Sequence, residues 1–73
     1  MEQLTALLKE RFPAIDWDNG TSLASDGVLD SVTMVEIITA LEDTYGIEVT
    51  MEYIQPDNFE SAEAIWNMVE ELQ

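Results

Sequence analysis

The residue pair with the clearest potential for chemistry is Asp30-Ser31, which stands just before a stretch with helical apolar spacing. A serine becomes a nucleophile when a neighbouring base takes its proton and an oxyanion hole receives the developing charge. The chain has no histidine, and its single lysine, Lys9, falls in a different predicted helix. Ser31 is therefore not expected to be a hydrolase nucleophile. Its hydroxyl can still be a point of covalent attachment. The enzyme that modifies it would bring its own base and metal ion.

The residue types that the chain lacks limit the chemistry further. Without cysteine there is no disulfide and no thiolate metal site, and without histidine the commonest metal ligand is missing. The segment 16–20, DWDNG, begins like a calcium-binding loop, but Gly20 and Gly27 stand where such a loop needs ligands. We therefore expect a turn at 16–20 and no metal site.

Size and charge exclude several classes of function. The 73 residues allow one domain, 1–73, too small to enclose a deep catalytic cleft. The net charge of −14 argues against nucleic-acid binding and against anionic membrane surfaces. No apolar run approaches the roughly 20 residues that span a bilayer, and the N-terminus lacks the basic start of a signal peptide. We expect a cytoplasmic, monomeric protein with no membrane insertion.

The helices that must position Ser31 are predicted from the periodicity of apolar residues and from residues typical of helix ends. Asp30 suits the N-cap of a helix over 31–45, and Gly46 suits its left-handed end. Ser61 suits the N-cap of the last helix. The predicted fold is all-α, a small bundle of three main helices and one short helix with a long first loop. The main helices are expected at 2–12, 31–45 and 62–72, with a helical turn at 51–54 and the short helix from Pro56.

Two loops are expected between these helices. The long first loop, 13–30, carries five apolar residues that we expect to pack over the helices: Ile15, Trp17, Leu23, Val28 and Leu29. The segment 51–58 has few apolar anchors, and we expect it to have the lowest local stability.

The helix predicted at 31–45 has two different faces. Met34, Ile37, Ile38, Leu41 and Tyr45 form a core-facing stripe. The opposite face carries two apolar residues, Val32 and Val35, surrounded by acidic residues. Residues 12–73 hold fourteen acids and no base, so these acids have few possible partners within the chain. Such a face is either a solvated surface or a docking surface for basic partners. We refer to seven residues of this region as the docking face: Asp30, Val32, Val35, Glu36, Thr39, Glu42 and Asp43.

The stretch 26–49, DGVLDSVTMVEIITALEDTYGIEV, resembles the acyl carrier and peptidyl carrier proteins. The segment 56–72, PDNFESAEAIWNMVEEL, resembles them too, so the resemblance runs from residue 2 to residue 72. In that family the serine of an Asp-Ser-Leu motif carries 4′-phosphopantetheine, and Ser31 is the matching position. Val32 departs from the usual leucine or methionine, which puts partner preference in doubt.

The resemblance implies a non-catalytic carrier that holds an acyl or aminoacyl group as a thioester on the arm of Ser31. It implies three partners: a phosphopantetheinyl transferase, an adenylating ligase that loads the group, and a downstream acyltransferase or synthase. The run Gly-Val-Leu-Asp-Ser is similar to D-alanyl carrier proteins, whereas Thr33 replaces an acid frequent in fatty-acid carriers. An amino-acid or small-acyl carrier is favoured, with fatty-acid and polyketide carriers left open.

Two alternatives from other classes remain. An unmodified acidic helical adaptor would use the same docking face without a prosthetic group, and modification of Ser31 distinguishes the two. A small acid–base enzyme could use a pair of carboxylates, as glycosidases do, although the size of the chain argues against a cleft.

Overall fold

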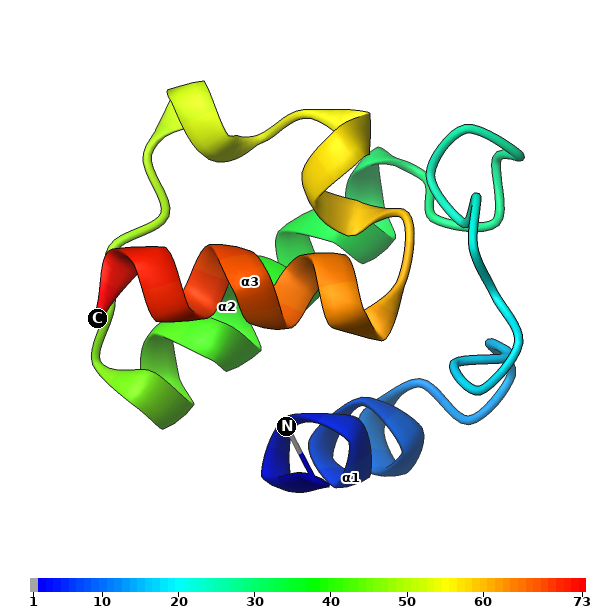
Figure 1. Cartoon of the computed structure of the whole chain (residues 1–73), viewed down its shortest axis with the longest axis horizontal. Coiled ribbons are helices and arrows are strands. Elements are labelled where there is room, and N and C mark those ends of the chain that lie inside the picture. The colour runs from blue at the N-terminus through cyan, green and yellow to red at the C-terminus, as the bar shows by residue number, and fades with distance from the viewer. Residues whose placement is uncertain (1) are drawn as a thin grey trace.

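The computed structural model describes residues 2–73, which form three α-helices and two short 3₁₀ helices (Figure 1). The all-α prediction is confirmed, and two short helical elements stand where one short helix and a turn were expected. In chain order the elements are α1 (Glu2–Arg11), α2 (Ser31–Tyr45), η1 (Met51–Tyr53), η2 (Pro56–Phe59) and α3 (Ala62–Leu72).

Side-chain and backbone caps define the ends of the helices. The Asp30 carboxylate accepts a hydrogen bond from the Thr33 N–H at 2.8 Å, and the Ser61 hydroxyl accepts one from the Ala64 N–H at 3.1 Å. These bonds satisfy donors that have no partner inside a helix. Gly46 ends α2 with φ of 65°, a conformation that glycine adopts without strain. The sequence therefore predicted these three boundaries from the correct residues.

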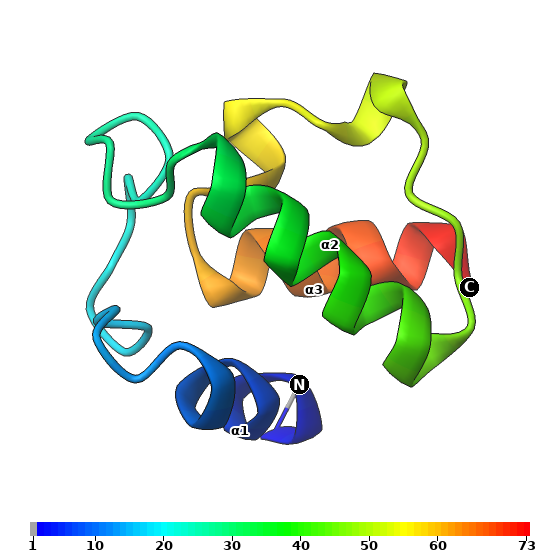
Figure 2. The ribbon, with the colours of Figure 1, turned by 180° about the vertical axis from the view of Figure 1, so that it is seen from behind.

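The arrangement of the helices follows from the connections between them. Helices α2 and α3 cross each other and run in the same general direction, and α1 lies along one side of them in the opposite direction (Figures 1 and 2). Residues 46–61 return the chain from the end of α2 to the start of α3. Between the helices lies an entirely apolar core, formed mainly by Leu4, Leu8, Ile37, Leu41, Phe59, Ile65, Met68 and Val69.

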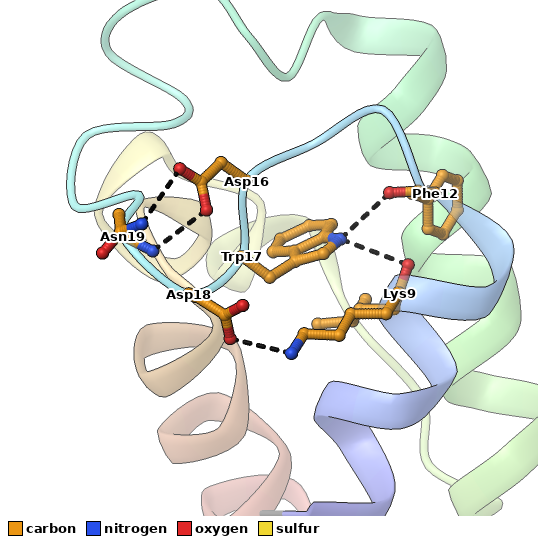
Figure 3. Close-up of polar contacts among 7 residues, drawn as sticks. Lys9, Phe12, Asp16, Trp17, Asp18 and Asn19 are labelled. Atoms are coloured by element: carbon orange, nitrogen blue, oxygen red, sulfur yellow. Dashed lines mark hydrogen bonds and ion pairs between the residues drawn. The ribbon is translucent and has the colours of Figure 1, made fainter.

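The first connection, residues 12–30, is packed down rather than loose. Trp17 is 4% exposed, and its indole N–H donates to the carbonyl oxygens of Leu8 at 3.1 Å and Phe12 at 3.2 Å (Figure 3). It therefore ties the connection to the C-terminal end of α1. Leu23 and Leu29 are buried too, and Ile15 is partly buried.

Val28 does not follow the prediction that the apolar residues of this connection all pack inward. Its side chain is 49% exposed. The chain bends at residues 28–29, and Leu29, which is 3% exposed, takes the buried position there.

The predicted turn at 16–20 is confirmed. Asp16 accepts hydrogen bonds from the backbone N–H and the side-chain amide of Asn19 (Figure 3). The Gly20 N–H donates to the Asp16 carbonyl at 3.0 Å. Within residues 2–73 no cluster of acidic side chains is arranged to hold a metal ion. In the same range no helix is long and apolar enough to cross a membrane.

Candidate functional site

Ser31 is the first residue of α2, and its side chain is exposed. Its hydroxyl makes no hydrogen bond with any other residue in the described range 2–73. The other three serines differ from it in contacts or burial. The Ser25 hydroxyl donates to Glu60, the Ser61 hydroxyl caps α3, and Ser22 is half-buried. Ser31 is thus the serine whose hydroxyl is both accessible and unengaged.

Asp30 fixes the helix end that bears Ser31. Hydrogen bonding from the Thr33 backbone N–H lowers the pKa of the Asp30 carboxyl, so the cap is ionised at neutral pH. Ser31 follows directly, at the end of the helix where the macrodipole is positive. A negatively charged ester on its hydroxyl would lie in favourable surroundings there, partly opposed by the neighbouring Asp30 carboxylate.

Most of the docking face is exposed as the sequence predicted. Val32 is 67% and Val35 is 61% exposed, and Asp30, Glu36, Thr39 and Asp43 are exposed as well (Figure 2 shows α2 from this side). Two large exposed aliphatic side chains on one helix are unusual for a face that only meets water, and they suit the apolar centre of a contact surface.

Glu42 has a different environment from the rest of the docking face. It is half-buried, and its carboxylate oxygen Oε2 accepts a hydrogen bond from the Val49 backbone N–H at 3.0 Å. Glu42 therefore ties the segment after α2 back onto the helix. This contact occupies one of its two carboxylate oxygens and leaves the other for solvent or a partner.

An open groove of about 360 Å³ borders the docking face. Val35, Glu36, Thr39 and Ala40 of α2 form one wall, and Arg11 and Phe12 at the end of α1 form the other. Arg11 at the end of α1 and Phe12 just beyond it were not predicted from the sequence, because a contact between segments so far apart in the chain leaves no local pattern. The groove offers a recess beside Val35 for an apolar side chain of a partner.

The charges of the chain are separated in space. Both basic residues lie on α1, where Lys9 pairs with Asp18 at 2.8 Å. Among residues 2–73 this is the one ion pair within 4.0 Å, and both its side chains are largely exposed, so it contributes little to stability. Within residues 2–73 no acid of α2 forms an ion pair within 4.0 Å, and Arg11 is the basic residue that lines the groove beside Glu36.

Glu60 was also missed from the sequence. This residue lies between η2 and α3, and its carboxylate accepts hydrogen bonds from the backbone N–H groups of Ala24 and Ser25. Ser25 and Ala24 lie 35 and 36 positions before Glu60 in the sequence. In the sequence, Glu60 looks like any other surface acid of an acidic protein.

Comparison with known protein families identifies the kind of domain. A family model described as the phosphopantetheine attachment site matches residues 2–64, most of the chain. Comparisons with curated proteins and with solved structures gave no significant match. Members of the family carry 4′-phosphopantetheine covalently on a serine and are themselves non-catalytic. The chain therefore belongs to the phosphopantetheine-binding family of carrier domains, which includes the acyl carrier and peptidyl carrier proteins.

Proposed function

We propose that Ser31 is the attachment residue of this carrier and that α2 presents the loaded arm to partner enzymes. The observation that carries the proposal is the exposed, unbonded hydroxyl of Ser31 at the N-terminus of a helix capped by Asp30. The family match shows a carrier of 4′-phosphopantetheine, and among the four serines Ser31 has the side chain suited to receive it.

The surroundings of Ser31 fit the prosthetic group. A phosphodiester needs space and a positive potential, and the exposed first residue of α2 offers both. When bound, the group supplies a terminal thiol that holds an acyl group as a thioester, a function that a chain without cysteine cannot provide itself. The residues of the chain hold the ester and present it.

The attachment step uses coenzyme A as the donor. The Ser31 hydroxyl oxygen forms a bond to the phosphorus that bears the pantetheine, and the phosphoanhydride bond from that phosphorus to the 5′-phosphate oxygen of the 3′-phosphoadenosine portion breaks. Adenosine 3′,5′-bisphosphate leaves, and the hydroxyl proton passes to a base of the transferase. No histidine exists in the chain to act as that base, so the transferase supplies it together with its metal ion.

The docking face is proposed to bind the three partners in turn: the phosphopantetheinyl transferase, the adenylating ligase and the acyltransferase or synthase. Exposed acids flank Val32 and Val35, and the groove beside Val35 can admit an apolar side chain. Basic patches would be attracted to the acids, and the valines would supply the dehydrated centre.

We propose a finer identity for the carrier from the residues near Ser31. The run Gly27-Val28-Leu29-Asp30-Ser31 supports an amino-acid or small-acyl cargo of the D-alanyl type, loaded by an adenylating ligase. Fatty-acid and polyketide carriers are the competing subclass. We further propose that residues 1–73 form one domain that acts as a monomer in the cytoplasm.

Intact mass tests the attachment. The protein is incubated with coenzyme A, magnesium and a broad-specificity phosphopantetheinyl transferase, beside the Ser31→Ala variant. We expect the wild-type chain to gain one phosphopantetheinyl group and the variant to gain none. If the folded wild-type chain gains nothing, the unmodified acidic adaptor becomes the better account.

Charge reversal tests the docking face. Glu36→Lys places a positive charge beside Val35, and we expect a lower kcat/KM for modification, by about tenfold. Glu70→Lys makes the same change on the exposed surface of α3 and serves as the matched control. Equal loss in both variants would show that only the net charge of the chain matters.

A further inference from the structure

The segment immediately before α2 is held by one side chain from the opposite end of the sequence. We name residues 22–29 the attachment loop. The Glu60 carboxylate oxygen Oε1 accepts from the N–H of Ala24 at 2.9 Å and of Ser25 at 2.8 Å, and Oε2 accepts from the Ser25 hydroxyl. The Glu60 carbonyl oxygen accepts from the Leu23 N–H at 2.9 Å. A single residue thus holds three consecutive residues of the loop.

These contacts continue through the loop to the attachment serine. The Leu23 carbonyl oxygen accepts from the Leu29 N–H at 3.1 Å, and Leu29 is 3% exposed in the core. Leu29 is followed directly by the cap Asp30 and then by Ser31. Each hydrogen bond in this series fixes the position of the next residues. The position of the Ser31 hydroxyl therefore depends on the attachment loop, which Glu60 holds against the start of α3.

The chemistry of Glu60 suits this task. The Ser25 hydroxyl and the loop N–H groups lower the pKa of the Glu60 carboxyl, so it is an ionised acceptor at neutral pH. Hydrogen bonds to a charged acceptor are stronger than those between neutral groups. The chain thereby fixes a loop that exposes Val28, three residues before Ser31.

We propose that Glu60 is a positioning residue for modification of Ser31, acting through the attachment loop and not by touching the substrate. The inference rests on the proposed attachment at Ser31. It assigns to an acid outside the docking face a role in presenting the hydroxyl, separate from the attraction of basic partners.

Three variants separate this role from a structural one. Glu60→Ala removes all side-chain contacts to the loop. Glu60→Gln keeps an oxygen that can accept from Ala24 and Ser25, and its amide N–H can donate to the Ser25 hydroxyl. Ser25→Ala removes one contact and keeps the two to the backbone. Glu70→Ala, an exposed acid of α3, controls for the loss of one negative charge.

The measurement is the steady-state rate of transfer from coenzyme A by a broad-specificity phosphopantetheinyl transferase, at a temperature where circular dichroism shows the variants folded. We expect Glu60→Ala to lower kcat about tenfold with KM changed less than about twofold, because docking is intact and the hydroxyl is misplaced. Ser25→Ala should lower kcat about twofold. Glu60→Gln and Glu70→Ala should stay within about twofold of wild type.

Each result decides between distinct conclusions. Wild-type protein that is never modified refutes the attachment at Ser31. If wild-type protein is modified and folded Glu60→Ala has the same kcat, only the role of Glu60 is refuted. Equal loss of kcat in Glu60→Ala and Glu70→Ala also overturns it, because the lost negative charge would then explain the effect. If Glu60→Ala does not fold, Ser25→Ala decides, and an unchanged kcat there overturns the inference.

Discussion

The two connections on either side of α2 are held in different ways. The first connection, residues 12–30, is anchored by the buried Trp17 ring with its two hydrogen bonds and by the contacts of Glu60. The second connection, residues 46–55, has Ile47 and Val49 buried near its start and the Glu42 contact to Val49.

Beyond Thr50 the second connection has local side-chain hydrogen bonds, and its long-range electrostatic contact is that of Tyr53 with Glu71 of α3, whose charge raises the pKa of the Tyr53 hydroxyl. The Gln55 amide donates to the Glu52 carbonyl oxygen at 2.6 Å, and Met51 is 87% exposed. In Figure 1 this segment lies on the far side of the molecule from the first connection. The connection that leads into Ser31 is thus anchored to distant residues by a buried ring and several long-range hydrogen bonds, whereas the connection that leads away has fewer such anchors beyond Thr50.

The strongest way to break this comparison is to remove the anchor of the first connection. Trp17→Ala deletes a buried ring and removes the indole donor from the Leu8 and Phe12 carbonyl oxygens, which keep backbone donors, so we expect the free energy of unfolding to fall by about 3–5 kcal/mol. Urea denaturation measures it. Trp17→Phe keeps a ring and should lose about 1–3 kcal/mol. A loss under about 1 kcal/mol for Trp17→Ala would contradict the anchoring role.

Gly20 gives the next largest effect. A Cβ atom there would lie 2.5 Å from Leu23 Cδ2 and 2.7 Å from the Asp16 carbonyl oxygen. Gly20→Ala should therefore lower the free energy of unfolding by about 1–3 kcal/mol, because the turn and the buried leucine must shift. Thr21→Ala, at the exposed next position, should stay within about 0.5 kcal/mol of wild type. Equal thermal midpoints for the two variants would show that the first connection adjusts to the added Cβ atom with little loss of stability.

Acid should loosen the first connection at two points. The pKa values of Asp30 and Glu60 are lowered in the folded chain from ordinary values of 3.8 and 4.5. Their stabilisation is fully present above those ordinary values and is lost as the pH falls through the lowered folded values. Amide NMR signals of Ala24, Ser25 and Thr33 should therefore shift below about pH 4.

The control for the acid titration is Glu60→Gln. It should abolish the shift of the Ala24 and Ser25 signals and leave that of Thr33, which reports on Asp30. Signals of Ala24 and Ser25 that still titrate in this variant would mean that another group moves them.

The smallest effect is expected in the second connection. Met51 is almost fully exposed, so Met51→Ser should change the free energy of unfolding by less than about 0.5 kcal/mol. Amide exchange sharpens the contrast, since residues 51–58 should exchange faster than residues 23–29. Slower exchange in 51–58 would reverse the comparison.

Local signals made much of the fold predictable from sequence. Asp30, Gly46 and Ser61 mark helix ends because caps act within a few residues, and α2 and α3 occupy the ranges predicted for them. The groove wall from Arg11 and Phe12 and the contacts of Glu60 depend on residues brought together by the whole fold. Glu42 shows the same limit, because its position on the helix indicated a docking residue while its contact to Val49 depends on the path of the chain beyond α2.

The central claim is that Ser31 alone carries the prosthetic group, and fragment mass spectrometry of the modified chain tests it most directly. The protein is modified with coenzyme A and a phosphopantetheinyl transferase, digested, and each fragment containing Ser22, Ser25, Ser31 or Ser61 is weighed. We predict the added group on the fragment containing Ser31 and on no other. A group found on Ser22, Ser25 or Ser61, with Ser31 unmodified, would contradict the account.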